Sequence, residues 1–168
     1  MTAPSPDAVT QALQRVLAAQ HAAVYGYPVI GVALRGAGQI RLARQLEARH
    51  RHTRDEVMAQ LAARRATPAP AEASYRPTQP LAAPADAQRW ALDLEEACAG
   101  AYRYLLVAPV LTATGASPGS DASSAPSARE QAGLRKQALA GLTTAALTAT
   151  QWRSLLSPGT PTTPFPGL

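Results

Sequence analysis

Hydrophobic residues recur every three or four positions in four segments of the chain, and segments rich in Pro, Gly and Ser separate them. This spacing places the apolar side chains on one face of a helix, and proline-rich segments interrupt helices. The pattern predicts helices at about residues 6–35, 39–65, 85–108 and 128–156. We therefore expect an all-α protein.

The connections between the helices predict their arrangement. The glycine turn at residues 36–38 is short, which makes the first two helices an antiparallel hairpin. The proline-rich segment 67–84 is long enough to traverse a bundle, which makes the second and third helices parallel. This long crossover is typical of ferritin-like four-helix bundles. We also expect a flexible loop at 113–126 and a proline-rich tail at 157–168, within one ferritin-like domain that spans residues 1–168.

Local signals refine the helix ends. Ser127 and Glu130 have the spacing of a capping box, in which each side chain bonds the free backbone N–H of the other residue. Pro28 lies inside the first hydrophobic stripe, where a proline removes one backbone hydrogen bond and kinks the helix. The third helix is expected to end near Pro109.

The charge distribution suggests contacts between helices and with partners. The chain carries 16 Lys and Arg against 11 Asp and Glu, for a formal net charge of +5. Arginines gather on the second predicted helix and acids on the third, so we expect these two helices to pack side by side with their charges paired; two solvated faces are the alternative. An acidic partner would bind at Arg44, Arg51 and Arg54. With 5% aromatic residues and no nucleic-acid-binding motif, we expect no specific nucleic-acid binding.

The single cysteine, Cys98, excludes an intramolecular disulfide and is typical of a cytoplasmic protein. It lies among apolar residues, which favours an inert core thiol over a nucleophile. The N-terminal residues lack the features of a signal peptide, and the uncharged apolar stretch 22–34 is shorter than a membrane span. We therefore expect a cytoplasmic protein with no membrane partner.

Several motifs carry a family resemblance. They are residues 20–27 (QHAAVYGY), residues 50–55 (HRHTRD), Tyr75 with Pro77 and Pro80, residues 94–103 (LEEACAGAYR), Trp152 with Arg153, and residues 165–168 (FPGL). In these motifs the chain resembles the DUF4439 proteins, an actinobacterial ferritin-like family of unknown function. The resemblance implies a four-helix ferritin-like domain and no particular activity. Family members often carry Glu at the position of Gln20, so this substitution argues against a metal role there.

The acidic and histidine residues do not complete a di-metal centre. Such a centre takes one Glu from each of two helices and a Glu-x-x-His pair from each of the other two. The second predicted helix offers Glu47 and His50, but the fourth has Glu130 as its only acid and no histidine. We therefore expect neither a di-metal centre nor another bound cofactor.

Two other arrangements of these residues remain open. Counted along the helices from the glycine turn, a reduced site for a single Fe, Mn or Zn ion would consist of His21, Glu47, His50 and Glu95. The favoured arrangement is instead a buried polar layer in which the side chains satisfy one another. Its members would be Gln20, His21, Tyr25, His50 and Glu95.

No complete catalytic set is visible in the sequence: no Ser/His/Asp arrangement, phosphate-binding loop or cysteine cluster. We therefore expect a non-enzymatic binding or assembly module, which could form a homodimer through its alanine-rich helix faces. One alternative is a divergent ferritin-like oxidoreductase that uses the single-metal site. The second alternative is a nucleic-acid-associated or ribosome-associated factor that uses the arginines of the second helix.

Overall fold

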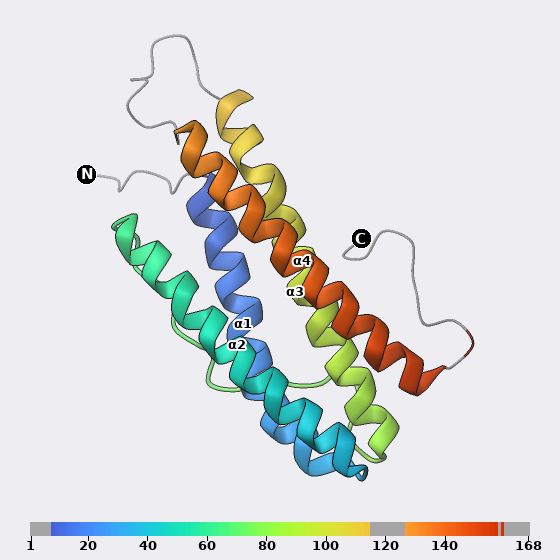
Figure 1. The fold of residues 1–168 in the computed structure, drawn as a ribbon. Helices are drawn as coiled ribbons and strands as arrows, with labels where there is room; N and C mark the ends of the chain where they lie inside the picture. Colours follow the sequence, from blue (N-terminus) through green and yellow to red (C-terminus); the bar gives the residue numbers. More distant parts are fainter. Residues whose placement is uncertain (1–7, 115–126, 158, 160–168) are drawn as a thin grey trace.

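The computed structural model describes residues 8–114, 127–157 and 159. The described chain forms four helices, which are α1 (Ala8–Ala33), α2 (Ala37–Ala63), α3 (Pro84–Thr114) and α4 (Ala128–Leu156). Figure 1 shows one elongated bundle in which α1 runs antiparallel to α2, and α3 antiparallel to α4. The prediction of an all-α four-helix bundle with a long crossover between the second and third helices is confirmed.

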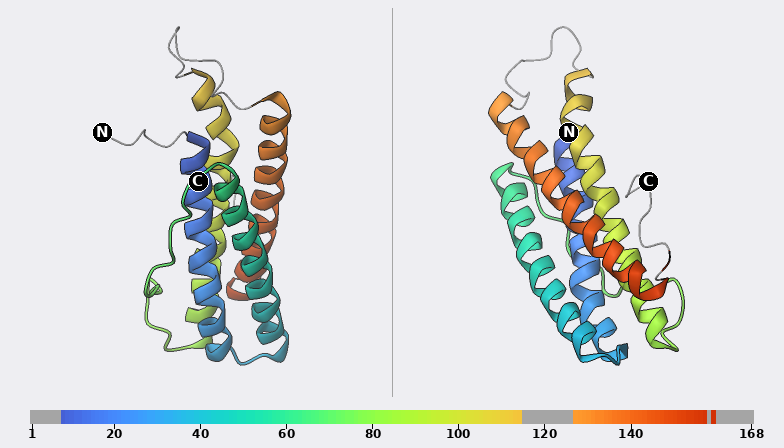
Figure 2. Two further views of the ribbon diagram at one scale, coloured as in Figure 1. Left: turned by 90° about the vertical axis from the view of Figure 1, so that its left-hand side faces the viewer. Right: turned by 45° about the vertical axis from the view of Figure 1, so that its right-hand side comes forward.

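The crossover lies along the outside of α1, as Figure 2 shows. One side chain of α1 holds its first part: Nε2 of Gln14 donates to the carbonyl oxygen of Thr67 at 2.7 Å, and Oε1 of Gln14 accepts from the amide of Ala69 at 3.0 Å. At the other end, the Thr78 hydroxyl donates to Asp93 at 3.0 Å. Side chains of α1 and α3 thus satisfy backbone and side-chain groups of a segment that has no helix or strand of its own.

The order of the helices around the bundle differs from the sequence expectation. α1 packs against α2 and α3, and α3 packs against α4, whereas no Cα atoms of α2 and α3 lie within 8 Å of each other. The predicted side-by-side packing of the second and third helices is therefore wrong, because α1 lies between them and places them on a diagonal. α2 and α4 also have no Cα atoms within 8 Å of each other, which leaves a seam between these two helices.

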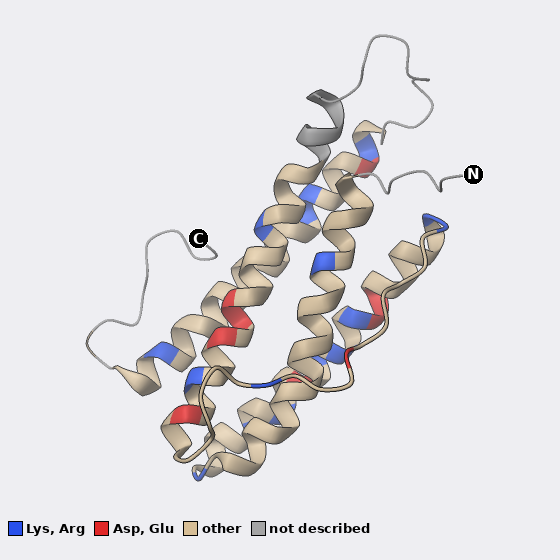
Figure 3. Ribbon diagram, turned by 180° about the vertical axis from the view of Figure 1, so that it is seen from behind, with Lys and Arg blue, Asp and Glu red and all other residues tan. Residues whose placement is uncertain are grey.

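The acidic residues of α3 accordingly find other partners. Glu96 pairs with Arg153 of α4, and Asp86 with Arg89 one turn later on α3. Among the acids of α3 that the structure describes, Glu95 alone forms an ion pair with α2. Figure 3 shows basic and acidic positions interspersed along the helices as seen from behind.

Two apolar clusters form the core, one toward each end of the bundle. The cluster near the α1–α2 turn contains Tyr27, Trp90 and Trp152, and the cluster at the opposite end contains Leu13, Leu17 and Leu105. Burial of such side chains contributes about 1.5–3 kcal/mol each, which makes these clusters the main source of stability. Polar side chains lie in the layer between them.

α1 is long and apolar enough to cross a membrane by length and composition, with 44% of its most hydrophobic window buried in the bundle. The sequence expectation considered only the uncharged apolar stretch at residues 22–34, which by itself is shorter than a membrane span. The buried residues of α1 include Leu13, Val16 and Ile30, each with no exposed surface. Its apolar face therefore has partners within the bundle.

The helix ends follow the predicted signals in part. Oγ of Ser127 accepts from the backbone N–H of Glu130 at 3.2 Å, whereas the Glu130 carboxylate pairs with Arg64 of α2. α3 continues past Pro109 to Thr114, because a proline weakens and bends a helix without having to end it. The predicted loop lies outside the described residues from position 115 onward, and so does most of the predicted tail.

Candidate functional site

Three helices each place one polar side chain in the layer between the apolar clusters. Gln20 of α1, His50 of α2 and Glu95 of α3 are 1%, 5% and 0% exposed. Nδ1 of His50 lies 2.7 Å from Oε1 of Gln20, and Nε2 of His50 lies 3.0 Å from Oε1 of Glu95. Both atoms that the ring approaches are oxygens, so His50 bridges Gln20 of α1 and Glu95 of α3 through its two ring nitrogens.

Tyr27 extends this layer to the fourth helix. Its hydroxyl donates to Oε1 of Glu95 at 2.5 Å and accepts from the indole N–H of Trp152 at 3.3 Å. Burial, and then the charge of Glu95, raises the pKa of the Tyr27 phenol well above its usual value. The phenol therefore stays protonated and donates to the carboxylate.

Cys98 lies one turn beyond Glu95 on α3, and its Sγ accepts from Nε2 of Gln20 at 3.7 Å. Burial raises the pKa of this thiol well above its usual value, and the charge of Glu95 raises it further. The thiolate is the nucleophilic form of cysteine, so Cys98 is a buried neutral thiol with a packing role.

Arg49 connects the polar layer to α4. Its Nη2 donates to Oγ1 of Thr148 at 3.0 Å and lies 3.7 Å from Oε1 of Glu95. The Arg49 side chain is 38% exposed, so water screens much of its charge. Arg49, His50 and Tyr27 all approach the same oxygen of Glu95.

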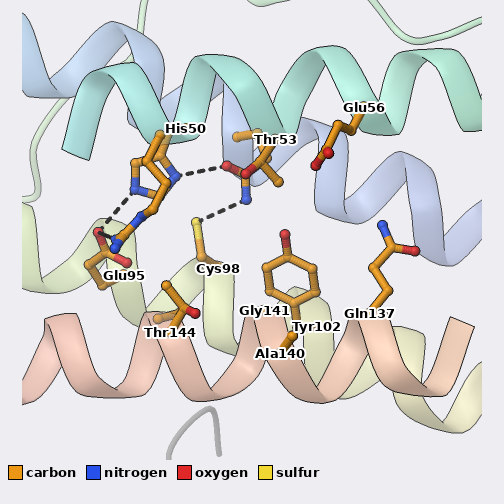
Figure 4. A pocket seen from close by; sticks show the side chains of 13 residues that line it. His50, Thr53, Glu56, Glu95, Cys98, Tyr102, Gln137, Ala140, Gly141 and Thr144 are labelled. Atoms are coloured by element: carbon orange, nitrogen blue, oxygen red, sulfur yellow. Dashed lines mark hydrogen bonds and ion pairs between the residues drawn. The ribbon is translucent and has the colours of Figure 1, made fainter. Parts of the chain in front are cut away.

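The second oxygen of Glu95 has no such neighbours. Oε2 is buried, and no hydrogen-bond donor reaches it from any residue that the structure describes. The Glu95 residue lines a cavity of about 220 Å³ between α2 and α4 (Figure 4). The lining residues are Gln20 from α1; Arg49, His50, Thr53 and Glu56 from α2; Glu95, Cys98 and Tyr102 from α3; and Gln137, Ala140, Gly141, Thr144 and Ala145 from α4.

A glycine of α4 makes room for the ring of Tyr102 beside this cavity. A Cβ atom on Gly141 would lie 2.4 Å from Cε1 and Cζ of the Tyr102 ring, so this ring packs directly against the α4 backbone. The Tyr102 hydroxyl points into the cavity in Figure 4, and burial raises its pKa above the usual value. Among the described residues the Tyr102 hydroxyl has no hydrogen-bond partner, which leaves a protonated phenol available to a ligand.

The outer end of the cavity adjoins a wider groove. Glu56 and Gln137 line both the cavity and a groove of about 800 Å³ between the end of α2 and the start of α4. The Glu56 side chain is 56% exposed. The cavity and the groove therefore share two lining residues, one of which is exposed to solvent.

His21 and Tyr25 do not join the buried polar layer. Nε2 of His21 lies 3.2 Å from the carbonyl oxygen of Ala69, and the Tyr25 ring lies 5.5 Å from that of Tyr75, both in the crossover. His21 follows Gln20 directly, and one residue along a helix rotates the side chain by about 100°. Both side chains consequently face outward and hold the crossover.

The four side chains of the single-metal set do not meet at one point. Glu47 pairs with Arg51 on its own helix, and His21 binds the crossover, so only His50 and Glu95 are in contact. Over the part of the chain that the structure describes, no three His, Cys, Asp or Glu side chains form a group that could hold a metal ion.

The arginines considered for an acidic partner are only partly free. Arg51 pairs with Glu47, and Arg54 pairs with Asp55 at 2.6 Å. Arg44 is exposed and forms no ion pair within the described residues.

Tyr27, Cys98, Trp152 and Arg49 were missing from the predicted polar layer. Tyr27 lies seven positions after Gln20, which is two helical turns and therefore the same face. The spacing of seven residues is therefore a sequence signal that places Tyr27 in the same buried layer as Gln20. Cys98 was instead predicted as an inert core thiol, and Trp152 was quoted for the family resemblance. The sequence gives no signal for the contact between Arg49 and α4.

Comparisons with known proteins give a family and a structural relative. Residues 12–117 match the family described as "Domain of unknown function (DUF4439)". The crystal structure of a conserved hypothetical protein, rv2844, from Mycobacterium tuberculosis is similar with a TM-score of 0.71 and 31% sequence identity. The similarity covers 91% of this chain and 100% of that chain. The search of curated proteins finds no match.

Proposed function

Because the chain belongs to the DUF4439 family, for which no function is described, we propose from its site alone that it is a non-enzymatic binding module. The module binds a small polar molecule in the cavity between α2 and α4. This role follows the sequence expectation of a binding module and names the place where binding occurs.

The observation that carries the proposal is the unpaired Oε2 of the buried Glu95. A buried polar atom without a partner costs about 1–3 kcal/mol, and more when the group is charged. Buried polar atoms are nearly always paired in folded proteins. An unpaired carboxylate oxygen on a residue that lines a cavity, together with other polar side chains, is best explained by a ligand that supplies the missing hydrogen bond.

The chemistry of Cys98, Tyr27 and His50 supports binding rather than catalysis. Burial raises the pKa values of Cys98 and Tyr27, so neither is an anionic nucleophile or a base near neutral pH. Both ring nitrogens of His50 are already hydrogen-bonded within the protein. A general base needs a free acceptor within reach of the substrate proton, and His50 has none.

A ligand screen tests this function. The probes are amines, alcohols, amides and carboxylates of about four to ten non-hydrogen atoms, a size that suits the cavity. We expect at least one probe to raise the melting temperature of the protein and to shift amide NMR signals of cavity residues such as Thr53 and Thr144.

A pair of neighbouring substitutions controls for nonspecific effects. Ala140 lines the cavity, whereas the adjacent Leu139 is 49% exposed and does not. Ala140→Phe should block binding, and Leu139→Phe should leave it intact. Failure of every probe class to bind the wild-type protein would refute the proposed function.

A further inference from the structure

We propose that the ligand presents a protonated primary amine, which donates a hydrogen bond to Oε2 of Glu95. This inference rests on the proposed function and adds the chemical class of the ligand. It starts from the difference between the two oxygens of one carboxylate. Oε1 is approached by Tyr27, His50 and Arg49, and Oε2 by no donor of the described chain.

The hydrogen-bond pattern determines that the ligand is a donor. The Tyr27 hydroxyl and the His50 ring both donate to Oε1, which is the pattern expected around an ionised carboxylate. An ionised carboxylate accepts hydrogen bonds and cannot donate them. The group beside Oε2 must therefore carry N–H or O–H.

The other cavity groups favour an ammonium group among the donors. Hydrogen bonds between charged partners are about twice as strong as those between neutral partners. An ammonium group has three N–H bonds, and the cavity offers further oxygen acceptors on Tyr102, Thr144 and Gln137. In Figure 4 Thr144 lies on the Glu95 side of the cavity, whereas Tyr102 and Gln137 lie farther along it. An amine at Oε2 can thus direct its remaining hydrogens toward Thr144, and further polar groups of the ligand toward Tyr102 and Gln137.

The charges around the cavity permit a cation. The cavity is lined by the carboxyl side chains of Glu95 and Glu56, and Arg49 is the basic side chain that faces them. His50 is already engaged by Oε1 of Glu95, and Arg49 is partly exposed and bonded to Thr148. Oε2 therefore lies on the side of the carboxylate that the positive groups do not cover.

The volume limits the size of the amine. A water molecule occupies about 30 Å³ in the liquid, so a cavity of about 220 Å³ holds a small organic molecule. A chain of four carbon atoms with an amino group fits within this space.

The experiment compares three probes of matched size. Butylamine, butan-1-ol and butyrate have the same carbon chain and differ in charge and hydrogen-bonding at the end group. Each is titrated into the isotopically labelled full-length protein at constant ionic strength, and amide shifts give the Kd. We expect the amine to bind at least about tenfold more tightly than the alcohol or the carboxylate, because only the amine brings a charged donor to Oε2.

Substitution of Glu95 then separates this contact from general electrostatics. In Glu95→Gln the side-chain oxygen still accepts from Tyr27 and His50, so the amide NH₂ faces the cavity in place of Oε2. We expect this variant to lose amine binding by about tenfold or more. Glu56→Gln removes the same charge from the exposed end of the cavity, and should change the Kd of the amine by less than about threefold.

The outcomes distinguish the amine class from the binding site itself. Butyrate or butan-1-ol could bind more strongly than butylamine and lose this binding in Ala140→Phe. This result would overturn the assignment of the ligand as an amine and leave the proposed function standing. An equal loss of amine affinity in Glu95→Gln and Glu56→Gln would also overturn the assignment of the ligand as an amine. No binding by these three probes or by any other class of the ligand screen, with water as the sole occupant beside Oε2, would overturn both proposals. If Glu95→Gln does not fold, the three-probe comparison on the wild type and Ala140→Phe decides the question.

Discussion

The hydroxyl of Tyr27 donates a 2.5 Å hydrogen bond to Oε1 of Glu95, although the two residues lie 68 positions apart in the sequence. The same hydroxyl accepts from Trp152, and the Tyr27 ring stacks on the ring of His50 with a centroid distance of 5.3 Å and an angle of 15°. Tyr27 of α1 therefore contacts one residue from each of the other three helices. Its hydrogen bond to Oε1 fixes one side of the Glu95 carboxylate.

Removal of this hydroxyl should destabilise the bundle. Tyr27→Phe keeps the ring but leaves the Trp152 indole N–H unpaired and removes one donor from Glu95. We expect the free energy of unfolding to fall by about 1.5–3 kcal/mol, the range for hydrogen bonds to charged groups. Urea unfolding near neutral pH measures this change. Tyr25→Phe is the control, because Tyr25 is 40% exposed and should lose less than about 0.5 kcal/mol. Equal losses in the two variants would contradict the role assigned to Tyr27.

Alkaline pH should destabilise the folded state. Burial raises the pKa values of the Cys98 thiol and of the Tyr27 and Tyr102 phenols above their ordinary values of 9.0, 10.0 and 10.0. The unfolded chain loses these protons first, so above about pH 9 the folded state holds more protons and stability falls as pH rises. Each group contributes a slope of at most about 1.4 kcal/mol per pH unit.

Urea unfolding at a series of pH values from neutral to about pH 11 checks this sign and its origin. Tyr27→Phe lacks one of the three groups, so its stability should decline less steeply above about pH 10 than that of the wild type. A wild-type stability that stays constant over this range would show that the buried groups do not control the alkaline response.

The helices could be predicted from the sequence, but their neighbours could not. Hydrophobic spacing determines where a helix forms, and the lengths of the connections at 36–38 and 67–84 determine its direction. Which helices touch depends on side-chain shape across the whole interface. The charge pattern predicted the wrong pair of neighbouring helices. Two acids of α3 pair with Arg153 and Arg89, and Glu95 is the one acid of α3 in the described chain that pairs with α2.

The candidate site could be predicted in part, from polar residues that interrupt hydrophobic stripes. Gln20 and His50 lie at stripe positions, and the structure brings both together with Glu95. His21 and Tyr25 belong to other faces of the same helix, where a small rotation decides between the interior and the crossover. The cavity had no sequence signal, because it depends on the seam between α2 and α4.

The contact between Gln14 and the crossover should protect that segment from proteolysis. Gln14→Ala leaves the Thr67 carbonyl and the Ala69 amide without their side-chain partner. We expect proteinase K to cleave within residues 66–83 at least about threefold faster, because local opening costs less when such bonds are missing. Gln45→Ala, at an exposed position of α2, is the control. Cleavage at the same rate in both variants would exclude the predicted role of Gln14.

The absence of a side chain at Gly141 should be necessary for the packing of Tyr102. Gly141→Ala would place Cβ 2.4 Å from Cε1 and Cζ of the buried Tyr102 ring, which must then shift toward the cavity. We expect the free energy of unfolding to fall by about 1–3 kcal/mol from overpacking, measured by urea unfolding, even though alanine favours helices by about 1 kcal/mol over glycine.

Gly133→Ala on the same helix is the matched control: no atom lies within 4 Å of its Cβ, so this variant should be about 0.5–1 kcal/mol more stable than the wild type. Gly141→Ala combined with Tyr102→Leu should recover part of the loss, because leucine removes the ring that clashes. If Gly141→Ala alone is as stable as Gly133→Ala, the Tyr102 ring does not pack against α4 as the structure shows.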